Sequence, residues 1–223
     1  MKQLLILTIA AAAFAAACAD PAANKPKAQT SEPVAIETVK PEAASGDIMT
    51  DFKAAGTALD ITADSSTVEF TGSKVTGSHA GGFKSFRGVI DLVGEKAESS
   101  KVLVEIDMLS VYTDADGLTK HLQTGDFFEV EKYPKATFAS TKIVPDTAAG
   151  AGHYTVTGEL EMRGVKKTVT FPATIAINPE TVTVNAEFSI NRKDFGIVYA
   201  GKADDLIRDD VVIRLDLTAP RKK

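Results

Sequence analysis

Residues 181–190 read TVTVNAEFSI, and this stretch decides the fold. Apolar side chains occupy every even position from Val182 to Ile190, and polar side chains occupy every odd position from Thr181 to Ser189. A period of two residues is that of a β-strand whose two faces meet different surroundings. The stretch therefore predicts a long strand with one apolar face and one polar face.

The same alternation recurs in residues 102–108, 154–162 and 211–217. Less regular runs of the same kind occupy residues 67–76, 83–93, 136–144 and 165–177. The pair Arg163-Gly164 stands between two of these runs and predicts a tight hairpin turn. Strands of this number and length suit a closed barrel, which leaves no exposed edge. We therefore expect an all-β protein, an eight-stranded antiparallel β-barrel.

Residues 118–130 form the one stretch with a helical pattern. His121 and Leu122 fall on one helical face, Gly125 interrupts the pattern, and Asp126 is placed to cap a second turn. A helical segment between barrel strands is typical of a lid. We expect a short helical plug at one end of the barrel.

Composition and motifs exclude several functions. The 223-residue chain has a formal net charge of −5 and a pI near 5.3, whereas nucleic-acid binding needs a concentrated basic surface. The histidines, His79, His121 and His153, lie far apart without metal-ligand spacing. No nucleophile or phosphate-loop motif is complete. We expect a non-catalytic protein with no metal site and no nucleic-acid partner.

The N-terminus predicts export and anchoring. Residues 1–17 combine a positive start at Lys2 with an apolar run and small residues, which is the pattern of a secretory signal peptide. Residues 15–18, AAAC, resemble a bacterial lipobox, which implies that Cys18 becomes acylated and attaches the protein to a membrane. The residue after this cysteine is Ala19 and not aspartate, which resembles lipoproteins that are exported to an outer membrane. We expect a periplasmic protein that is lipid-anchored to the periplasmic side of the outer membrane.

Residues 18–56 differ in composition from the rest of the chain. They contain Pro21, Pro26, Pro33 and Pro41 and a single aromatic residue, so they lack the apolar surface that would offset ordering. We expect a lipidated N-terminus and a disordered tether that spans roughly 30–40 Å. The folded domain is then residues 57–223.

Several blocks of the domain, in order, resemble the YceI-like family of polyisoprenoid-binding, lipocalin-like periplasmic proteins. These blocks are residues 82–88, 110–113, 121–128, 133–141, 158–165 and 190–196. The resemblance implies an eight-stranded lipocalin-like barrel that holds an isoprenoid lipid or a quinone-type ligand in an apolar interior. Binding of such a chain needs burial of apolar area and no catalytic residue.

Candidate ligand contacts are the apolar residues expected on the inner faces and near the plug, with two polar residues at strand or helix ends. They are Phe70, Val104, Ile106, Met108, His121, Leu122, Phe127, Phe128, Phe138, Leu160, Phe188, Arg192 and Phe195. Arg192 could fix a ligand carbonyl or hold the plug in place. Gly158 and Ala186 save volume on inner faces, which favours a hollow barrel over a solid one.

Two other classes of function remain open at this point. The alternation alone does not reveal which face points outward, so an integral outer-membrane β-barrel also fits it. An enzyme acting on the bound lipid would have to use scattered groups such as His79, His121 and Arg192. A homodimer that buries the barrel mouths is also compatible with the sequence.

Overall fold

The computed structural model describes residues 20–33, 49 and 52–221 of the chain. The longer strands are β2 (Thr57–Thr62), β3 (Thr67–Lys74), β4 (Gly77–Phe83), β5 (Phe86–Val93), β6 (Lys96–Asp107), β8 (Lys135–Pro145), β9 (His153–Met162), β10 (Val165–Ile177), β11 (Thr181–Asn191) and β14 (Asp210–Pro220). The shorter ones are β1 (Gln29–Ser31), β7 (Val111–Thr113), β12 (Gly201–Lys202) and β13 (Asp205–Leu206). Helical segments are α1 (Asp116–Leu122) and the 3-10 turns η1 (Met108–Ser110) and η2 (Arg192–Phe195).

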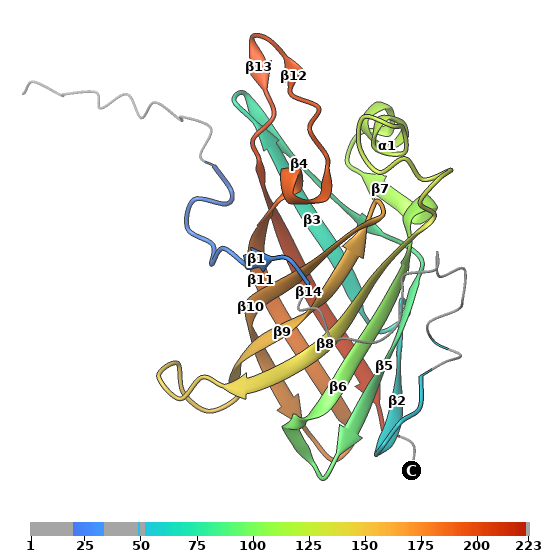
Figure 1. Ribbon diagram of the computed structural model, residues 1–223, viewed down its shortest axis with the longest axis vertical. Helices are drawn as coiled ribbons and strands as arrows, with labels where there is room; N and C mark the ends of the chain where they lie inside the picture. The colour runs from blue at the N-terminus through green and yellow to red at the C-terminus, as the bar shows by residue number, and fades with distance from the viewer. Residues whose placement is uncertain (1–19, 34–48, 50–51, 222–223) are drawn as a thin grey trace, which may run out of the picture.

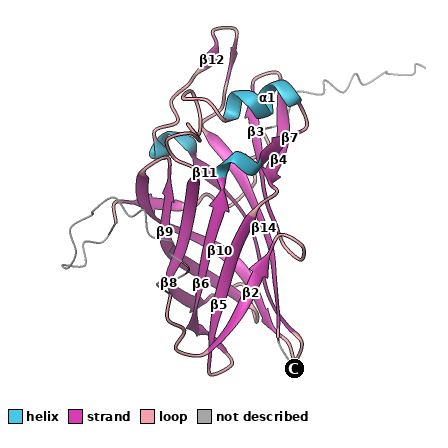
Figure 2. Ribbon diagram, turned by 90° about the vertical axis from the view of Figure 1, so that its right-hand side faces the viewer, coloured by secondary structure: helices cyan, strands magenta, loops and turns pink. Residues whose placement is uncertain are grey.

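The main sheet curls into a barrel (Figures 1 and 2). Its strands run in the order β2-β5-β6-β8-β9-β10-β11-β14-β3-β4-β7, all neighbours are antiparallel, and β1 pairs with β10. The end strand β2 returns to lie against β14. Between β2 and β3, Ser66 Oγ accepts the Thr218 N–H of β14 at 3.0 Å. The prediction of an all-β antiparallel barrel is confirmed.

The predicted number of eight strands is wrong. Within the described residues the main sheet has twelve strands. The predicted run 67–76 forms β3 as far as Lys74, and β4 is an additional strand between the predicted runs 67–76 and 83–93. The strand β2 joins the sheet because Leu59 and Ile61 are buried against it. Short strands such as β1 and β7 form through pairing with distant segments, which the local alternation does not report.

The alternation itself predicts the faces correctly. In β11 the residues Val182, Val184, Ala186, Phe188 and Ile190 are all buried in the barrel core. The Arg163-Gly164 hairpin between β9 and β10 also forms as predicted. Both residues have positive φ, 53° and 71°, which is the geometry of a two-residue turn between right-twisted strands.

The helical plug is shorter than predicted. α1 ends at Leu122, and residues 123–133 continue as turns in place of a second helical turn. Asp126 does not cap a helix there; its Oδ2 lies 2.8 Å from His121 Nε2. Backbone bonds hold the turns, including Phe128 N–H to Leu122 O at 3.0 Å. The segment lies beside β7 at one end of the barrel, which we call the mouth end (Figure 1).

Residues 20–33, the longest described part of the predicted tether, are ordered against the barrel, and we call them the N-terminal strap. Its Ala28 is buried and donates its N–H to Ser189 O at 2.8 Å, while the Ser189 N–H donates to Pro26 O at 2.8 Å. On its other side β1 pairs with Thr168–Thr170 of β10. The disordered-tether prediction is therefore wrong for this stretch.

The strap fills a seam in the barrel wall. Registered pairing between β10 and β11 covers only Thr174–Ile177 of β10, and the strap takes the place beside the earlier part of that strand. Polar contacts fasten it: Lys25 to Glu187 at 2.7 Å, Lys27 to Asp210 at 2.8 Å, Thr30 to Asp194 at 2.5 Å, Arg208 to Asp20 at 3.3 Å, and Lys167 to Glu32. These partners lie far along the chain, so local composition could not reveal the order. The predicted signal peptide 1–17 and acylated Cys18 lie outside the described residues.

Candidate functional site

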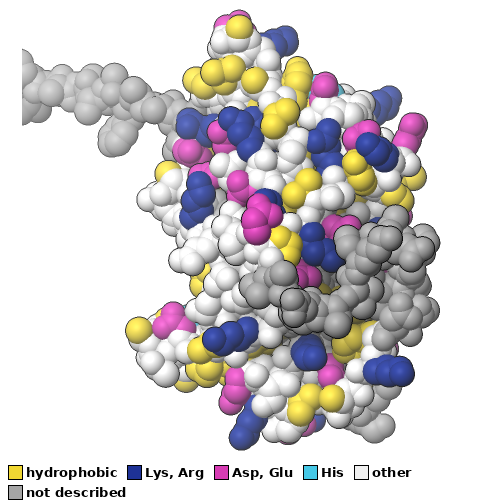
Figure 3. Space-filling model, in the orientation of Figure 1, with side chains coloured by type: hydrophobic (Ala, Val, Ile, Leu, Met, Phe, Trp, Pro, Cys, Tyr) yellow, Lys and Arg dark blue, Asp and Glu magenta, His cyan; other side chains and the backbone are white. Residues whose placement is uncertain are grey.

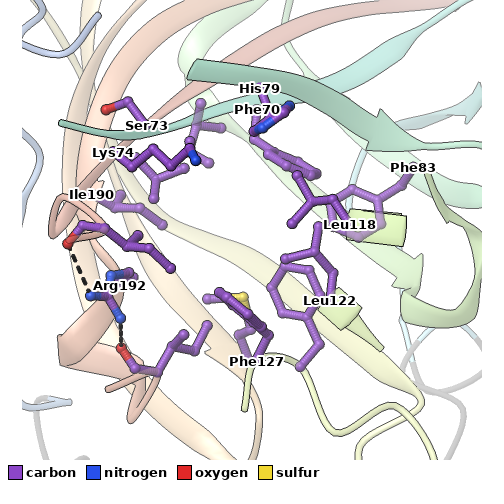
Figure 4. Close-up of a pocket in the computed structure, with 17 residues that line it drawn as sticks. Phe70, Ser73, Lys74, His79, Phe83, Leu118, Leu122, Phe127, Ile190 and Arg192 are labelled. Carbon is purple, nitrogen blue, oxygen red and sulfur yellow. Dashed lines mark hydrogen bonds between the residues drawn. The ribbon is translucent and has the colours of Figure 1, made fainter. Parts of the chain in front are cut away.

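Two apolar cavities lie side by side within the described part of the barrel. The first, at the mouth end, has a volume of about 280 Å³, and we call it the upper cavity (Figure 4). Its walls come from β3, β4, α1, the following turns, β11, β14 and the segment after η2. The lining residues are Phe70, Gly72, Ser73, Lys74, His79, Phe83, Leu118, Leu122, Phe127, Phe128, Met162, Ile190, Arg192, Ile197, Ile207, Val211 and Ile213.

The second, the inner cavity, has a volume of about 130 Å³ and lies deeper between the strands. Its lining is apolar apart from Glu69: Val68, Phe83, Val102, Val104, Ile106, Met108, Ala136, Phe138, Ile143, Val156, Leu160, Met162, Val169, Phe171, Ile175, Val184, Phe188, Ile190, Ile213, Leu215 and Leu217. Such a cavity offers a ligand burial of apolar surface and almost no hydrogen bonding.

The two cavities adjoin. They share the side chains of Phe83, Met162, Ile190 and Ile213, which we call the neck. Met162 is the most adaptable of these, because its unbranched thioether chain has three rotatable bonds. An elongated ligand that passes the neck would occupy both cavities.

Aromatic rings form one wall of the inner cavity. Phe171 stacks on Phe188 with ring centroids 4.2 Å apart and an interplanar angle of 11°, and Phe138 packs on Phe171 at 5.7 Å. The volume saved by Gly158 is not empty, because the Phe138 ring fills it: a Cβ on Gly158 would lie 2.5 Å from Phe138 Cζ. Gly158 therefore leaves room for the Phe138 ring and does not widen the cavity.

Most of the predicted contacts line a cavity. Phe70, Leu122, Phe127, Phe128 and Arg192 line the upper cavity. Val104, Ile106, Met108, Phe138, Leu160 and Phe188 line the inner one. The structure thus brings together residues from β3, β6, β8, β9, β11 and the α1 region. Contact of each with a ligand stays a prediction.

Two predicted contacts lie elsewhere. Phe195, in η2, is completely buried in the core and lines neither cavity. His121 lies outside both linings; its ring meets Phe127 edge-on at 5.0 Å and Tyr199 at 5.2 Å. His121 therefore supports the wall residue Phe127 from behind.

Arg192 lines the upper cavity, yet its guanidinium is engaged by the protein. It donates to the carbonyl oxygens of Ile197 at 2.7 Å and Ile207 at 3.4 Å (Figure 4). It also donates to the carbonyl oxygen of Arg208 at 3.1 Å and to Asp209 Oδ1 at 3.2 Å. Burial lowers the pKa of Arg192, and the charge of Asp209 opposes this shift. The side chain holds the segment 196–209 at the cavity wall.

A salt bridge fastens the β12–β13 hairpin at the mouth. Lys74, on the upper cavity lining, pairs with Asp205 of β13, and the Thr76 hydroxyl donates to the same carboxylate at 2.9 Å. The Lys74 hydrogen bond holds the pKa of Asp205 below its usual value, with Thr76 contributing. Lys74 was not predicted as a site residue, because a charge at the end of a strand usually faces solvent.

His79 is the other ionisable group in the upper lining. Its Nδ1 lies 2.8 Å from Asp114 Oδ1, and this hydrogen bond lowers the pKa of Asp114. Ser73 is in the same lining, and Figure 4 shows its hydroxyl directed away from His79. The serine and histidine are therefore not arranged as a nucleophile and its base.

Other large contributors to the walls were missed by the sequence prediction. Phe83, Phe171 and Met162 line one or both cavities. Met162 continues the inward phase of Leu160 along β9, so the alternation could have identified it.

Across residues 20–33 and 52–221, no cluster of three His, Cys, Asp or Glu side chains could hold a metal ion. Over the same ranges no helix is long and apolar enough to cross a membrane.

Known proteins share this barrel. BcnA of Burkholderia cenocepacia superposes with a TM-score of 0.61 at 29% identity, covering 71% of this chain and 99% of that one. A Campylobacter jejuni YCEI protein gives a TM-score of 0.53 at 29% identity over 64% of this chain and 85% of that one. A polyisoprenoid binding domain of Saccharophagus degradans, implicated in plant cell wall breakdown, superposes with a TM-score of 0.60 at 20% identity. The match covers 74% of this chain and 100% of that one, and it shows that the fold is shared.

Sequence relatives agree. A UPF0312 protein of Pseudomonas putida strain GB-1 is 34% identical over 139 residues, which are 60% of this chain and 71% of the relative. The family model of the YceI-like domain matches residues 59–219, from within β2 to within β14. That match covers more than half of the chain and takes in the walls of both cavities, so the chain belongs to the YceI-like family.

Proposed function

We propose that the protein binds an isoprenoid lipid, or a quinone-type ligand with an isoprenoid tail, along the upper and inner cavities. The apolar inner cavity that adjoins the upper cavity through the neck is the observation that carries this proposal. A methyl-branched chain gains about 0.8 kcal/mol for each CH₂ buried. The polyisoprenoid binding domain of Saccharophagus degradans has the same fold, which supports the choice of ligand class.

The ligand orientation follows from the linings. The isoprenoid tail occupies the inner cavity, and the head group stays in the upper cavity near Lys74. The basic side chains of this region already face carboxylates: Lys74 faces Asp205, His79 faces Asp114, and Arg192 faces Asp209. A head group without net charge can enter without separating these pairs.

The protein acts as a non-catalytic carrier or scavenger in the periplasm, anchored by an acylated Cys18 to the outer membrane. The lipobox-like residues 15–18 support the anchor. The apolar strand faces point inward, while the outer faces carry charged residues such as Glu187 and Arg214. An integral outer-membrane barrel would need the reverse arrangement.

Mass spectrometry tests the function. The full chain is expressed in a bacterium, purified without added lipid and extracted with organic solvent, and the extract should contain an isoprenoid or quinone in near-equal amount to the protein. A matched preparation of the variant Leu160→Trp, which fills the inner cavity, should lose it. An extract that repeatedly holds no such lipid would contradict the proposal.

Metabolic labelling with a fatty acid, compared between the full chain and Cys18→Ser, tests the anchor separately.

A further inference from the structure

Exposed apolar side chains gather at the mouth of the upper cavity. Val75, Val198 and Leu206 are 57%, 66% and 50% exposed. Val75 lies in the turn between β3 and β4, and its N–H donates to Leu206 O at 3.2 Å, so the two residues lie side by side. Val198 belongs to the segment between η2 and β12. We call these three residues the apolar tip.

The apolar tip adjoins the opening of the cavity. Lys74, Ile197 and Ile207, the chain neighbours of its three residues, all line the upper cavity. Figure 1 shows the β12–β13 hairpin and the β3–β4 turn projecting beyond the rest of the barrel, and Figure 3 shows hydrophobic side chains on this projection. Single exposed apolar residues are ordinary, but several on adjoining turns beside a cavity indicate a contact surface.

The charges near the apolar tip are balanced. Lys202 and Asp204 are exposed on the same hairpin, and Asp205 is paired with Lys74. A surface of this kind does not select a strongly charged partner. It matches the interfacial zone of a lipid bilayer, where apolar side chains enter and neighbouring charges stay among the head groups.

The start of the described chain lies at the same end. Asp20, the first described residue, accepts a hydrogen bond from Arg208 at 3.3 Å, and the Arg208 N–H donates to Ser73 O at 2.8 Å. Arg208 is two positions from Leu206 of the apolar tip. Cys18 precedes Asp20 by two residues, a reach of about 7 Å in extended chain. An anchor at Cys18 therefore keeps this end of the barrel, and not the opposite end, beside the membrane.

We infer that the apolar tip is a membrane-docking surface and that its partner is a phospholipid bilayer. Val75, Val198 and Leu206 enter the interface, and the upper cavity opens toward the lipid. A ligand then passes between bilayer and cavity without crossing water. This inference rests on the proposed function, because it takes the ligand to be a membrane lipid.

The chain contains no tryptophan, so a single introduced tryptophan reports its own surroundings. The test uses the full chain with Val75→Trp or Leu206→Trp, reconstituted in vesicles of phosphatidylethanolamine and phosphatidylglycerol with a brominated phosphatidylcholine. The matched control is Val144→Trp, since Val144 is also an exposed apolar residue, 40% exposed, near the far end of β8. Circular dichroism verifies that each variant is folded.

The expected result is blue-shifted emission and loss of most fluorescence for tryptophan at 75 and 206, with little change at 144. Equal quenching at the three positions, or none at 75 and 206, would overturn the inference. A blue shift that is already present without lipid, together with a dimer in light scattering, would assign the surface to a second copy and also overturn it.

A second measurement separates docking from ligand binding. The double variant Val75→Asp, Leu206→Asp should keep its bound lipid in detergent but take up lipid from vesicles at least several-fold more slowly than Val144→Asp. Unchanged uptake would count against docking. Absence of any isoprenoid from the native protein, with quenching still confined to the apolar tip, would instead refute the proposed ligand and leave the docking surface standing.

Discussion

The Phe138 ring occupies the space that a side chain at Gly158 would need. A Cβ on Gly158 would lie 2.5 Å from Phe138 Cζ and 2.6 Å from the Ala139 carbonyl oxygen. The variant Gly158→Ala must therefore displace the ring or the strand, which costs about 1–3 kcal/mol of unfolding free energy. Urea unfolding measures this loss, and the displaced ring should also reduce the amount of copurifying lipid.

The control for Gly158 is Gly72→Ala. Gly72 also lines the barrel interior, but a Cβ added there would meet no heavy atom of the described residues within 4 Å, apart from its own chain neighbours. The free energy of unfolding should stay the same or rise slightly, because alanine has less conformational freedom in the unfolded chain. Equal destabilisation by the two variants would show that packing against Phe138 is not the cause.

The neck provides a second prediction. Met162→Trp places a larger ring where the two cavities adjoin, so a long chain should no longer reach the inner cavity. We expect loss of most of the copurifying lipid, measured by extraction and mass spectrometry, with a cooperative unfolding transition retained. The control Leu109→Trp changes an exposed residue, 61% exposed, and should keep the lipid. Full lipid occupancy in Met162→Trp would contradict a ligand that spans both cavities.

Arg192 should stabilise the wall of the upper cavity. Replacing it by Met leaves the Ile197 and Arg208 carbonyl oxygens without their donor, and the unfolding free energy should fall by about 3 kcal/mol. Lys193→Met is the matched control, because Lys193 is exposed and pairs with the same Asp209 at 2.9 Å; such pairs contribute about 0–1 kcal/mol. Chemical denaturation measures the unfolding free energy of both variants and distinguishes the large loss at Arg192 from the small one at Lys193. If the Arg192 variant lost its lipid at unchanged stability, the residue would bind the ligand directly.

The attachment of the β12–β13 hairpin should depend on pH. The pKa of Asp205 is lowered in the folded protein from 3.8 because Lys74 donates to its carboxylate. Folding therefore favours the ionised Asp205 carboxylate. The stabilisation that this carboxylate gives to the folded hairpin is fully present above pH 3.8 and is lost as the pH falls below it. Hydrogen exchange should show the hairpin amides protected at neutral pH and increasingly exposed in strong acid.

The matched variants for this effect are Asp205→Asn and Asp204→Asn. The first should expose the hairpin amides already at neutral pH, while the second changes an exposed neighbour and should leave their protection unchanged. A hairpin that loses protection well above pH 3.8 in the unsubstituted protein would indicate that another group controls it.

The inner walls could be predicted from the sequence because a strand has a period of two and one face was consistently apolar. Phe188 and Leu160 lie on the inner wall as that period predicts. Phe195 does not, since the chain leaves the strand at Asn191 and η2 turns its side chain away from the cavities. Arg192 illustrates the same limit: its position was predictable, but its carbonyl partners lie in a segment that folds back from residues further along the chain.

The short strand β1 depends on tertiary pairing and had no local signal. β1 has three residues, and its order comes from Ser189, Thr168–Thr170 and distant charged partners. Low apolar content correctly indicates that this stretch cannot form a core of its own. It does not exclude ordering on the surface of a core made by other segments.

The N-terminal strap also has a consequence for the order of folding. Glu32 and its partner Lys167 are 135 residues apart, and Thr30 and Asp194 are 164 apart, although the strap is synthesised first. Contacts that close such long loops form late, because their entropy must be offset by structure that already exists. We therefore expect the barrel wall to be sealed only after β10 and β11 have formed. Until that last step, the seam between these strands stays open to the interior.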